Sequence, residues 1–347
     1  MKYSKIKKGA EIEKENDHIA VFSGCVSEEL AAFLHSIPFL KYFVSIFALF
    51  QMSRPGIVAV VLLTPASAAF LATNGFPAII PSIFGTLTIC LAVASAHIFN
   101  DYCDVEVDKI NPRACWRPLV KNLVSRKQAL FASILLAIAS VTCAAILNWT
   151  CAVILLFGIG FIYSYSAYFK GTVWGFLPPA LAAFIIPLGG FGAYNASAAF
   201  SKPAILMGLV GFFFELIPYW SQTIPDIEGD KTRKLPTIAV KYGASKTAAT
   251  ILITYLPCMV FMWLLGKEVH LSGLYFLIII CGGAAVALTI IFLLFKPAPS
   301  RALALYFTSL IFIGIVSVVI ILEKAYYAKE KYFDFGRQIL DFLEKNL

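Results

Sequence analysis

Nine predominantly apolar stretches of 15 to 25 residues recur along this chain, and they predict helices that cross a lipid bilayer. Of the 347 residues, 60% are hydrophobic and only 14% are charged, a balance that excludes a soluble domain and general disorder. The predicted spans are 54–73, 77–100, 129–147, 151–165, 173–194, 203–224, 247–265, 271–295 and 303–322. The composition therefore predicts an all-α polytopic membrane protein with nine transmembrane helices.

Polar segments flank the predicted spans on both sides. Residues 1–53 are predicted to be an N-terminal tail with an interfacial helix, and no apolar run follows the first residues at the distance typical of a cleaved signal. Residues 323–347 are charged, with apolar residues at helical spacing, which predicts an amphipathic C-terminal tail. Residues 54–322, with all nine spans, form the predicted intramembrane domain.

The distribution of basic residues predicts an orientation in the membrane. Lys and Arg gather in the loops after the second, fourth, sixth and eighth spans, whereas the opposite loops hold little beyond Lys202 and Lys267. An excess of Lys and Arg marks the cytoplasmic side, so the net charge of +8 indicates cytoplasmic loops and not nucleic-acid binding. In a prokaryote this would be the cell membrane. The eight cysteines form no CxxC pair, so neither a zinc site nor a disulfide framework is predicted.

Spans two and six both end in a cluster of acidic side chains. Asn100, Asp104 and Asp108 are spaced four apart, so they share one face if the helix continues past the membrane. Asp226 and Asp230 repeat this spacing after span six. Because four spans separate the clusters, both open on the same side. This predicts two four-helix pseudo-repeats plus one helix, arranged around a central cavity.

The mixture of acids and bases at this predicted mouth indicates a particular ligand chemistry. Charge at membrane depth is costly and usually functional. Converging carboxylates repel one another, and Mg²⁺ relieves that repulsion while it binds phosphate oxygens. Neighbouring Arg and Lys suit the remaining oxygens of a metal-bound phosphate. A phosphate at the mouth of an apolar cavity predicts a lipid diphosphate, whose departure Mg²⁺ would assist and whose tail the cavity would shield from water.

Both clusters resemble the signatures of one enzyme family. The first, Asn100-Asp101-x-x-Asp104-x-x-x-Asp108 with Arg113 and Arg117-Pro118-Leu119, resembles the first signature of the UbiA-type intramembrane prenyltransferases. The second, Pro225-Asp226-Ile227-Glu228-Gly229-Asp230 with a downstream Gly243, resembles the second signature. The resemblance covers about Arg54 to Leu322, and nine spans match that family.

The resemblance implies Mg²⁺-dependent transfer of a polyprenyl group from an isoprenoid diphosphate to a lipophilic acceptor, with release of diphosphate. It implies that Mg²⁺-diphosphate is held by five oxygen donors: Asn100, Asp104, Asp108, Asp226 and Asp230. It also implies that the diphosphate oxygens are contacted by four cations: Arg113, Arg117, Lys170 and Lys231. Asn122 and Lys234 stand where the family often has glycine. Asn tolerates a left-handed backbone, whereas Lys234 leaves the shape of its loop open.

Several acceptors and two alternative functions fit the sequence. The second motif resembles the branch that uses homogentisate-like rings, and also branches that use chlorophyllide or glyceryl ether lipids. The spacing of Arg113 and Arg117 instead resembles the hydroxybenzoate and haem branches, and an aromatic quinone-precursor acceptor is favoured. A terpene cyclase of the same superfamily would need no acceptor, and a polytopic transporter could share the repeated halves. His97 and Glu215, inside predicted spans, are interpreted either as acceptor-side groups or as packed side chains.

Overall fold

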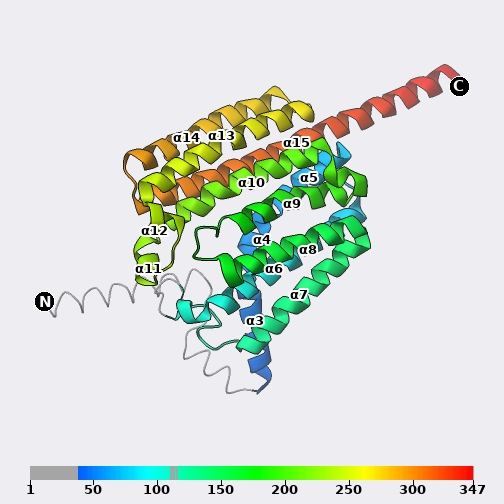
Figure 1. Cartoon of the computed structure of the whole chain (residues 1–347). Coiled ribbons are helices and arrows are strands. Elements are labelled where there is room, and N and C mark those ends of the chain that lie inside the picture. The colour runs from blue at the N-terminus through cyan, green and yellow to red at the C-terminus, as the bar shows by residue number, and fades with distance from the viewer. Residues whose placement is uncertain (1–37, 110–113, 115, 347) are drawn as a thin grey trace. The chain divides into compact units, whose positions relative to one another are not determined.

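The computed structural model describes residues 38–109, 114 and 116–346, and every regular element in this part of the chain is a helix (Figure 1). The first elements are α3 (Pro38–Met52), α4 (Pro55–Val61), α5 (Leu63–Thr73), α6 (Ile79–Asp108), α7 (Arg126–Leu147), α8 (Trp149–Ser164) and the π-helix η1 (Tyr165–Phe169). The remaining elements are α9 (Leu177–Gly192), the 3-10 helix η2 (Ala196–Phe200), α10 (Lys202–Thr223), α11 (Ile227–Thr232), α12 (Ile238–Tyr242), α13 (Ala244–Glu268), α14 (Gly273–Phe295) and α15 (Pro299–Asn346).

The helices of this described part confirm the predicted all-helical membrane protein. Eight helical segments are long and apolar enough to cross a membrane, and α9 is a shorter apolar helix that corresponds to the predicted fifth span. The first candidate span, Tyr42–Thr73, begins before the predicted limit at residue 54 because α3 is also apolar. The last continues to Lys329, beyond the predicted limit at residue 322. The division into two tails and one central domain stays a prediction.

Two charged residues at the predicted end of the last span are paired inside the protein. The Glu323 carboxylate accepts hydrogen bonds from the backbone nitrogen of Ser272 at 2.8 Å and from its hydroxyl at 2.5 Å. The Lys324 ammonium donates to the Asn74 side chain and to the Val269 carbonyl, both at 2.8 Å. Buried charges are tolerated when they are paired and hydrogen-bonded. Helix α15 therefore continues past two hydrogen-bonded charged residues that, in the sequence, resemble the end of a span.

The chain forms two compact units. Unit 1 comprises Leu91–Ile138 with the described residues up to Val58, and unit 2 comprises Ala59–Cys90 and Ala139–Leu347. Unit 1 has a small apolar core in which Met52 of α3 and Ile98 of α6 are almost fully buried. Reciprocal hydrogen bonds join α6 to α7, from the Ser95 hydroxyl to the Ser133 carbonyl at 2.7 Å and from the Ser133 hydroxyl to the Ser95 carbonyl at 3.1 Å. Small polar residues of this kind commonly join helices within a membrane.

Helix α10 packs against α9, α13 and α15 within unit 2 (Figure 1). Glycines on α10 allow its backbone to approach α9 closely. A Cβ atom on Gly208 would lie 2.6 Å from the Phe184 carbonyl oxygen, and one on Gly211 would lie 2.5 Å from that of Ala183. Small residues at such crossings are a common basis of helix association in membranes. These contacts hold in place the helix that leads to the second acidic motif.

Replacement of Gly211 by alanine is expected to destabilise unit 2, because the new methyl group would overlap a backbone carbonyl that has no freedom to rotate away. A loss of about 1–3 kcal/mol is typical of overpacking. Thermal unfolding in detergent measures it as a lowered Tm. Gly160→Ala on α8 is the matched control, since nothing lies within 4 Å of its Cβ position. Equal Tm values for the two variants would contradict the close crossing of α9 and α10.

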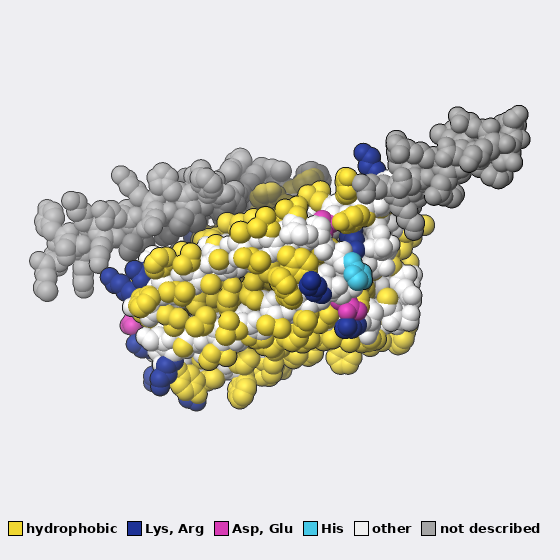
Figure 2. All heavy atoms as spheres, turned by 90° about the horizontal axis from the view of Figure 1, so that it is seen from above, with side chains coloured by type: hydrophobic (Ala, Val, Ile, Leu, Met, Phe, Trp, Pro, Cys, Tyr) yellow, Lys and Arg dark blue, Asp and Glu magenta, His cyan; other side chains and the backbone are white. Residues whose placement is uncertain are grey.

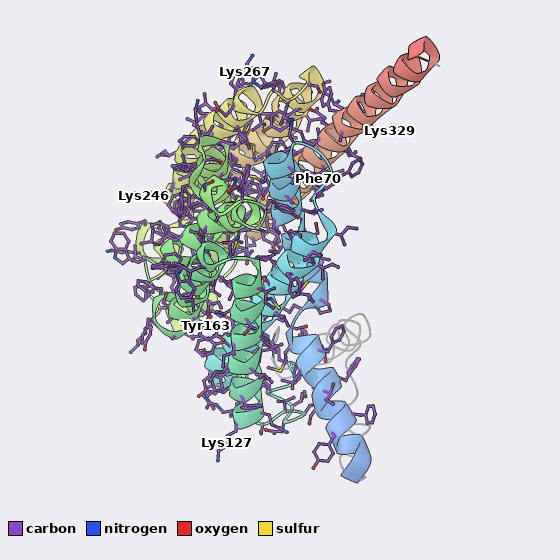
Figure 3. The ribbon with its side chains drawn as sticks, turned by 90° about the vertical axis from the view of Figure 1, so that its right-hand side faces the viewer. Phe70, Lys127, Tyr163, Lys246, Lys267 and Lys329 are labelled. Atoms are coloured by element: carbon purple, nitrogen blue, oxygen red, sulfur yellow. The ribbon has the colours of Figure 1, made fainter. Side chains whose placement is uncertain are left out.

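Hydrophobic side chains cover most of the face of the molecule drawn in Figure 2, and Lys and Arg gather toward its ends. Lys127 in the first turn of α7 and Lys267 in the last turn of α13 both point away from the helices (Figure 3). An exposed apolar surface of this kind is an aggregation liability in water but is solvated by lipid in a bilayer. The distribution is that of helices that are apolar where they face lipid and charged at their ends.

Candidate active site

The first acidic motif lies on α6, which continues without a break from its apolar part to Asp108. This continuity places Asn100, Asp104 and Asp108 on one face of the helix, one turn apart. The Asn100 amide donates a hydrogen bond to the Asp104 carboxylate at 3.0 Å. Both Asp104 and Asp108 are buried, so each carboxylate needs a charged partner or a ligand.

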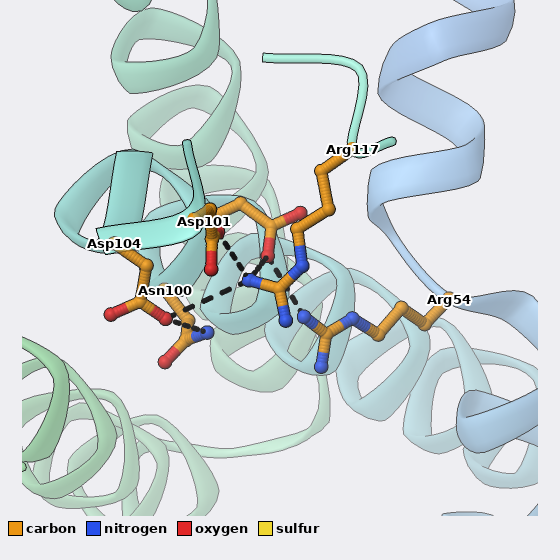
Figure 4. Close-up of polar contacts among 6 residues, drawn as sticks. Arg54, Asn100, Asp101, Asp104 and Arg117 are labelled. Carbon is orange, nitrogen blue, oxygen red and sulfur yellow. Dashed lines mark hydrogen bonds and ion pairs between the residues drawn. The ribbon is translucent and has the colours of Figure 1, made fainter. Parts of the chain in front are cut away.

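Arg117 supplies that partner in unit 1, and its guanidinium faces three carboxylates at once (Figure 4). Its Nη1 atom lies 2.6 Å from Asp108 Oδ2, 3.1 Å from Asp101 Oδ1 and 3.7 Å from Asp104 Oδ2. The residue stands in the loop between α6 and α7, where the sequence predicts a diphosphate contact. The structure therefore brings Arg117 to the acidic face of α6. Arg113 lies outside the described residues.

Two further residues join this cluster, and the motif spacing did not predict their role. Arg54, just before α4, donates to Asp101 Oδ1 at 2.8 Å (Figure 4). Asp101 is only 3% exposed and lies about 100° around α6 from Asn100, off the common face. Its two arginines come from opposite sides of α6 in the sequence, so no local periodicity indicates the contact. The indication in the sequence is that Asp101, a charged residue, follows directly on an apolar run.

The second acidic motif lies in unit 2, in the turn after α10 and in the short helix α11. Asp226 precedes α11, and the backbone nitrogen of Asp230 donates to its carbonyl at 2.8 Å. The buried Asp230 carboxylate accepts from Arg233 Nη2 at 2.6 Å and from the Thr237 hydroxyl at 3.2 Å. The predicted Lys231 instead pairs with Glu228 at 3.2 Å, where both side chains are exposed. Arg233, which the motif did not indicate, is thus the cation that reaches Asp230.

The loops that follow the two motifs end in the same backbone turn. The backbone nitrogen of Leu123 donates to the Pro118 carbonyl at 3.0 Å, and that of Leu235 donates to the Asp230 carbonyl at 2.9 Å. In each loop the preceding residue is left-handed, with φ 56° at Asn122 and φ 57° at Lys234. This is the Schellman arrangement, whose left-handed position favours glycine. Both residues that replace the family's glycine therefore keep the conformation of a glycine.

Lys170 lies beside the second motif, because the loop after η1 packs against it. Gly171 has a φ of 77°, and a Cβ atom there would lie 3.1 Å from the Leu235 side chain. Gly175 lies directly under the Tyr219 hydroxyl, with no room for a Cβ atom. The loop that carries Lys170 is thus held between α10 and the turn after α11. The residue after Lys170 therefore packs against Leu235, whose backbone nitrogen donates to the Asp230 carbonyl.

The oxygen donors of both motifs have the chemistry that Mg²⁺ prefers. Among the described residues, no group of three or more His, Cys, Asp and Glu side chains is arranged to hold a metal ion, and the acids of unit 1 converge on Arg117. Protein sites for Mg²⁺ commonly supply one or two carboxylates, with phosphate oxygens of the substrate completing the shell. Carboxylates paired with arginines therefore fit a metal ion that binds together with a phosphate.

Comparison with known proteins identifies a matching family. The profile of the UbiA prenyltransferase family matches residues 60–318. A protoheme IX farnesyltransferase of Cutibacterium acnes is 28% identical over 243 residues, which cover 67% of this chain and 69% of the relative. A digeranylgeranylglyceryl phosphate synthase of Sulfurisphaera tokodaii is 29% identical over 207 residues, which cover 57% of this chain and 72% of the relative.

Solved structures share the fold. A structure described for digeranylgeranylglyceryl phosphate synthase in membranes matches with a TM-score of 0.66 at 17% identity, covering 81% of this chain and 99% of the other. A UbiA homolog from Archaeoglobus fulgidus, bound to GPP and Mg²⁺, matches with a TM-score of 0.56 at 17% identity, covering 79% of this chain and 99% of the other. The fold is therefore the UbiA fold of multi-pass integral membrane proteins. With the family profile matching about three quarters of its length, this chain belongs to the UbiA prenyltransferase family.

Proposed function

We propose that this protein transfers a polyprenyl group from an isoprenoid diphosphate to a lipophilic acceptor in a Mg²⁺-dependent reaction that releases diphosphate. The observation that carries the proposal is the contact of Arg117 with three buried carboxylates on the first motif. Buried acids that share one guanidinium are poised to exchange partners when a phosphate and a cation bind together. The Archaeoglobus fulgidus homolog bound to GPP and Mg²⁺ supports this ligand chemistry.

The roles of the residues follow from their chemistry. Five side chains would supply oxygen ligands to Mg²⁺-diphosphate: Asn100, Asp104, Asp108, Asp226 and Asp230. Four cations would bind free phosphate oxygens: Arg113, Arg117, Lys170 and Lys231. Bound Mg²⁺ supplies a Lewis acid that takes up charge on the departing diphosphate. By the positive-inside rule, we place these residues on the cytoplasmic side.

The cations of the candidate site would act in different ways. Arg117 would exchange one carboxylate for a phosphate oxygen, since its planar fork binds both kinds of anion. Asp101, held by Arg54 at 2.8 Å, would keep Arg117 in place during that exchange. Lys170, beside the turn after α11, would approach the phosphate as a point charge. An apolar cavity would hold the hydrocarbon tail and exclude water from the allylic cation.

Two kinds of acceptor are supported by different observations. The second motif resembles that of enzymes that use homogentisate-like rings, and we propose an aromatic quinone-precursor acceptor on this basis. The similarity to protoheme IX farnesyltransferases and to digeranylgeranylglyceryl phosphate synthase favours protohaem or a glyceryl lipid instead. A panel that contains homogentisate, 4-hydroxybenzoate, protohaem and a glyceryl ether lipid separates these possibilities.

Removal of Mg²⁺ should stop the reaction without unfolding the protein. Purified protein with geranylgeranyl diphosphate and the acceptor panel should release diphosphate and form a prenylated product, read by mass, and excess EDTA should abolish both. The Tm of the ligand-free protein should not change with EDTA, because Arg54, Arg117 and Arg233 already form ion pairs with the buried acids. A cyclised hydrocarbon formed without acceptor would indicate a terpene cyclase. Solute counterflow in liposomes without diphosphate release would indicate a transporter.

A further inference from the structure

A stripe of polar side chains runs along one face of α10, leading from the second acidic motif into the apolar part of the helix. Tyr219 follows four residues after Glu215, and Gln222 follows three residues after Tyr219. At about 100° per residue, the three side chains fall within an arc of roughly 60° around the helix axis. Their spacing continues to Asp226, which follows four residues after Gln222. An ionisable residue within a membrane span is costly and is usually retained for function. We call these three residues the α10 polar stripe.

Tyrosines from two other elements of unit 2 face this stripe. Tyr306 of α15 lies close to Glu215 and Gln222. Tyr165 of η1 interacts with the Tyr219 hydroxyl, and the two rings meet edge to face with centroids 6.3 Å apart. Three elements thus direct hydroxyl, amide and carboxyl groups toward one strip of an otherwise apolar interior. This strip extends over about 10 Å of the helix axis.

Contacts with neighbouring side chains do not explain why Glu215 stands in the α10 polar stripe. Its side chain is partly buried, and it stands on α10, which packs against α9, α13 and α15. Among the described residues, its carboxylate makes no hydrogen bond and no ion pair. An unpaired carboxylate in such surroundings costs stability. A ligand that donates a hydrogen bond to it would remove that cost.

We propose that the α10 polar stripe binds the hydrogen-bonding group of the acceptor, with Glu215 accepting a hydrogen bond from a hydroxyl on it. The inference rests on the proposed function and deepens it, because it selects hydroxylated acceptors over those without a hydrogen-bond donor. The prenyl donor does not need the stripe, since its tail is a hydrocarbon and its polar end binds the acidic motifs. Glu215 is thus a specificity-determining residue on the acceptor side.

Steady-state kinetics of Glu215→Leu tests this assignment. The KM for homogentisate, the hydroxylated probe of the acceptor panel, should rise at least about tenfold, as expected for a lost hydrogen bond to a charged group. The KM for geranylgeranyl diphosphate should stay within about twofold of the unchanged protein, because the stripe does not touch diphosphate. The Tm should not fall, since leucine removes an unpaired carboxylate from an apolar interior. Glu215→Gln, which keeps a carbonyl oxygen, should lose less acceptor affinity than the leucine variant.

A matched pair of tyrosine variants separates binding from packing. Tyr306→Phe removes a hydroxyl beside the stripe and should raise the KM for homogentisate. Tyr255→Phe removes a buried hydroxyl that donates to the Gly283 carbonyl at 2.7 Å, away from the stripe, and should lower the Tm alone. An unchanged acceptor KM in Glu215→Leu would overturn the inference, as would equal increases of both KM values together with a lower Tm.

The outcome also separates this inference from the proposed function. Without any Mg²⁺-dependent diphosphate release by the unchanged protein, the proposed function fails. With release and transfer only to acceptors that lack a hydroxyl group, the function stands and the role of Glu215 is overturned. Titration of homogentisate against intrinsic tryptophan fluorescence gives a readout that is independent of turnover, and Glu215→Leu should weaken that binding by the same factor as it raises KM.

Discussion

Asp104→Asn and Asp230→Asn are each expected to lower Mg²⁺-dependent diphosphate release by at least about 10²-fold, a typical loss when a group that stabilises developing charge is removed. Each substitution keeps the shape of the side chain but removes the charge that would hold a divalent cation. The new amide at position 104 can still accept the hydrogen bond from Asn100. The new amide at position 230 can still accept the hydrogen bond from the Thr237 hydroxyl. The fold should therefore survive while turnover is lost. Release of diphosphate from geranylgeranyl diphosphate measures the effect.

Two exposed acids in the same segments serve as controls for this prediction. Glu106 lies on α6 with a 65% exposed side chain, and Glu228 lies on α11 with an 89% exposed side chain. Glu106→Gln and Glu228→Gln remove the same charge from the same helices but not from the buried face, and both should retain activity. Retained turnover in the Asp104 and Asp230 variants, or an equal loss in the two controls, would contradict the assignment of the buried acids.

Arg117→Ala is expected to destabilise unit 1 strongly, because it leaves two nearly inaccessible carboxylates without their shared partner. Asp101 and Asp108 have side chains only 3% and 6% exposed. Removal of one partner from a buried charge pair commonly costs about 3–5 kcal/mol. Arg54 would still neutralise Asp101, so the main loss should come from Asp108. The Tm in detergent should fall markedly, and diphosphate release should be lost as well.

Lys109→Ala is the matched control for that loss. Lys109 pairs with Glu106 at 3.0 Å, but both side chains are more than half exposed. Pairs of this kind contribute roughly 0–1 kcal/mol. An Arg117→Lys variant further separates charge from shape, since a single ammonium cannot face three carboxylates as a planar fork does. A Tm for Arg117→Ala as high as that for Lys109→Ala would show that the carboxylates find other partners.

Helix α6 illustrates how much of the candidate site the sequence predicts. The four-residue spacing from Asn100 to Asp108 predicts a shared face because helical geometry is local, and the continuous helix to Asp108 has that face. Arg117 follows within nine residues of Asp108, so the loop can reach back to the acids. The apolar spans are equally local, since length and composition alone define them. Motif, loop and span are all short-range patterns.

The residues that the sequence did not indicate depend on contacts between distant segments. Arg54 reaches Asp101 across 47 positions, and no periodicity relates them. Arg233 rather than Lys231 faces Asp230, because α11 is a six-residue helix whose register the motif spacing does not define. Glu323 and Lys324 resemble the end of a span, but they lie within α15 and form hydrogen bonds to residues at the ends of other helices. Contacts between segments that are distant in the sequence decide each of these cases, and a local sequence pattern does not indicate such contacts.

The paired turns after the two motifs have a consequence for how such a chain can diverge. Only the backbone of Asn122 and Lys234 is specified, since each side chain is exposed while the residue adopts a left-handed conformation. An L-residue other than glycine accepts that conformation at a cost of roughly 1–2 kcal/mol. Mutation can therefore change the charge at these two positions without changing the path of either loop. They are positions where the two loops can acquire different electrostatic character while both keep the same backbone turn.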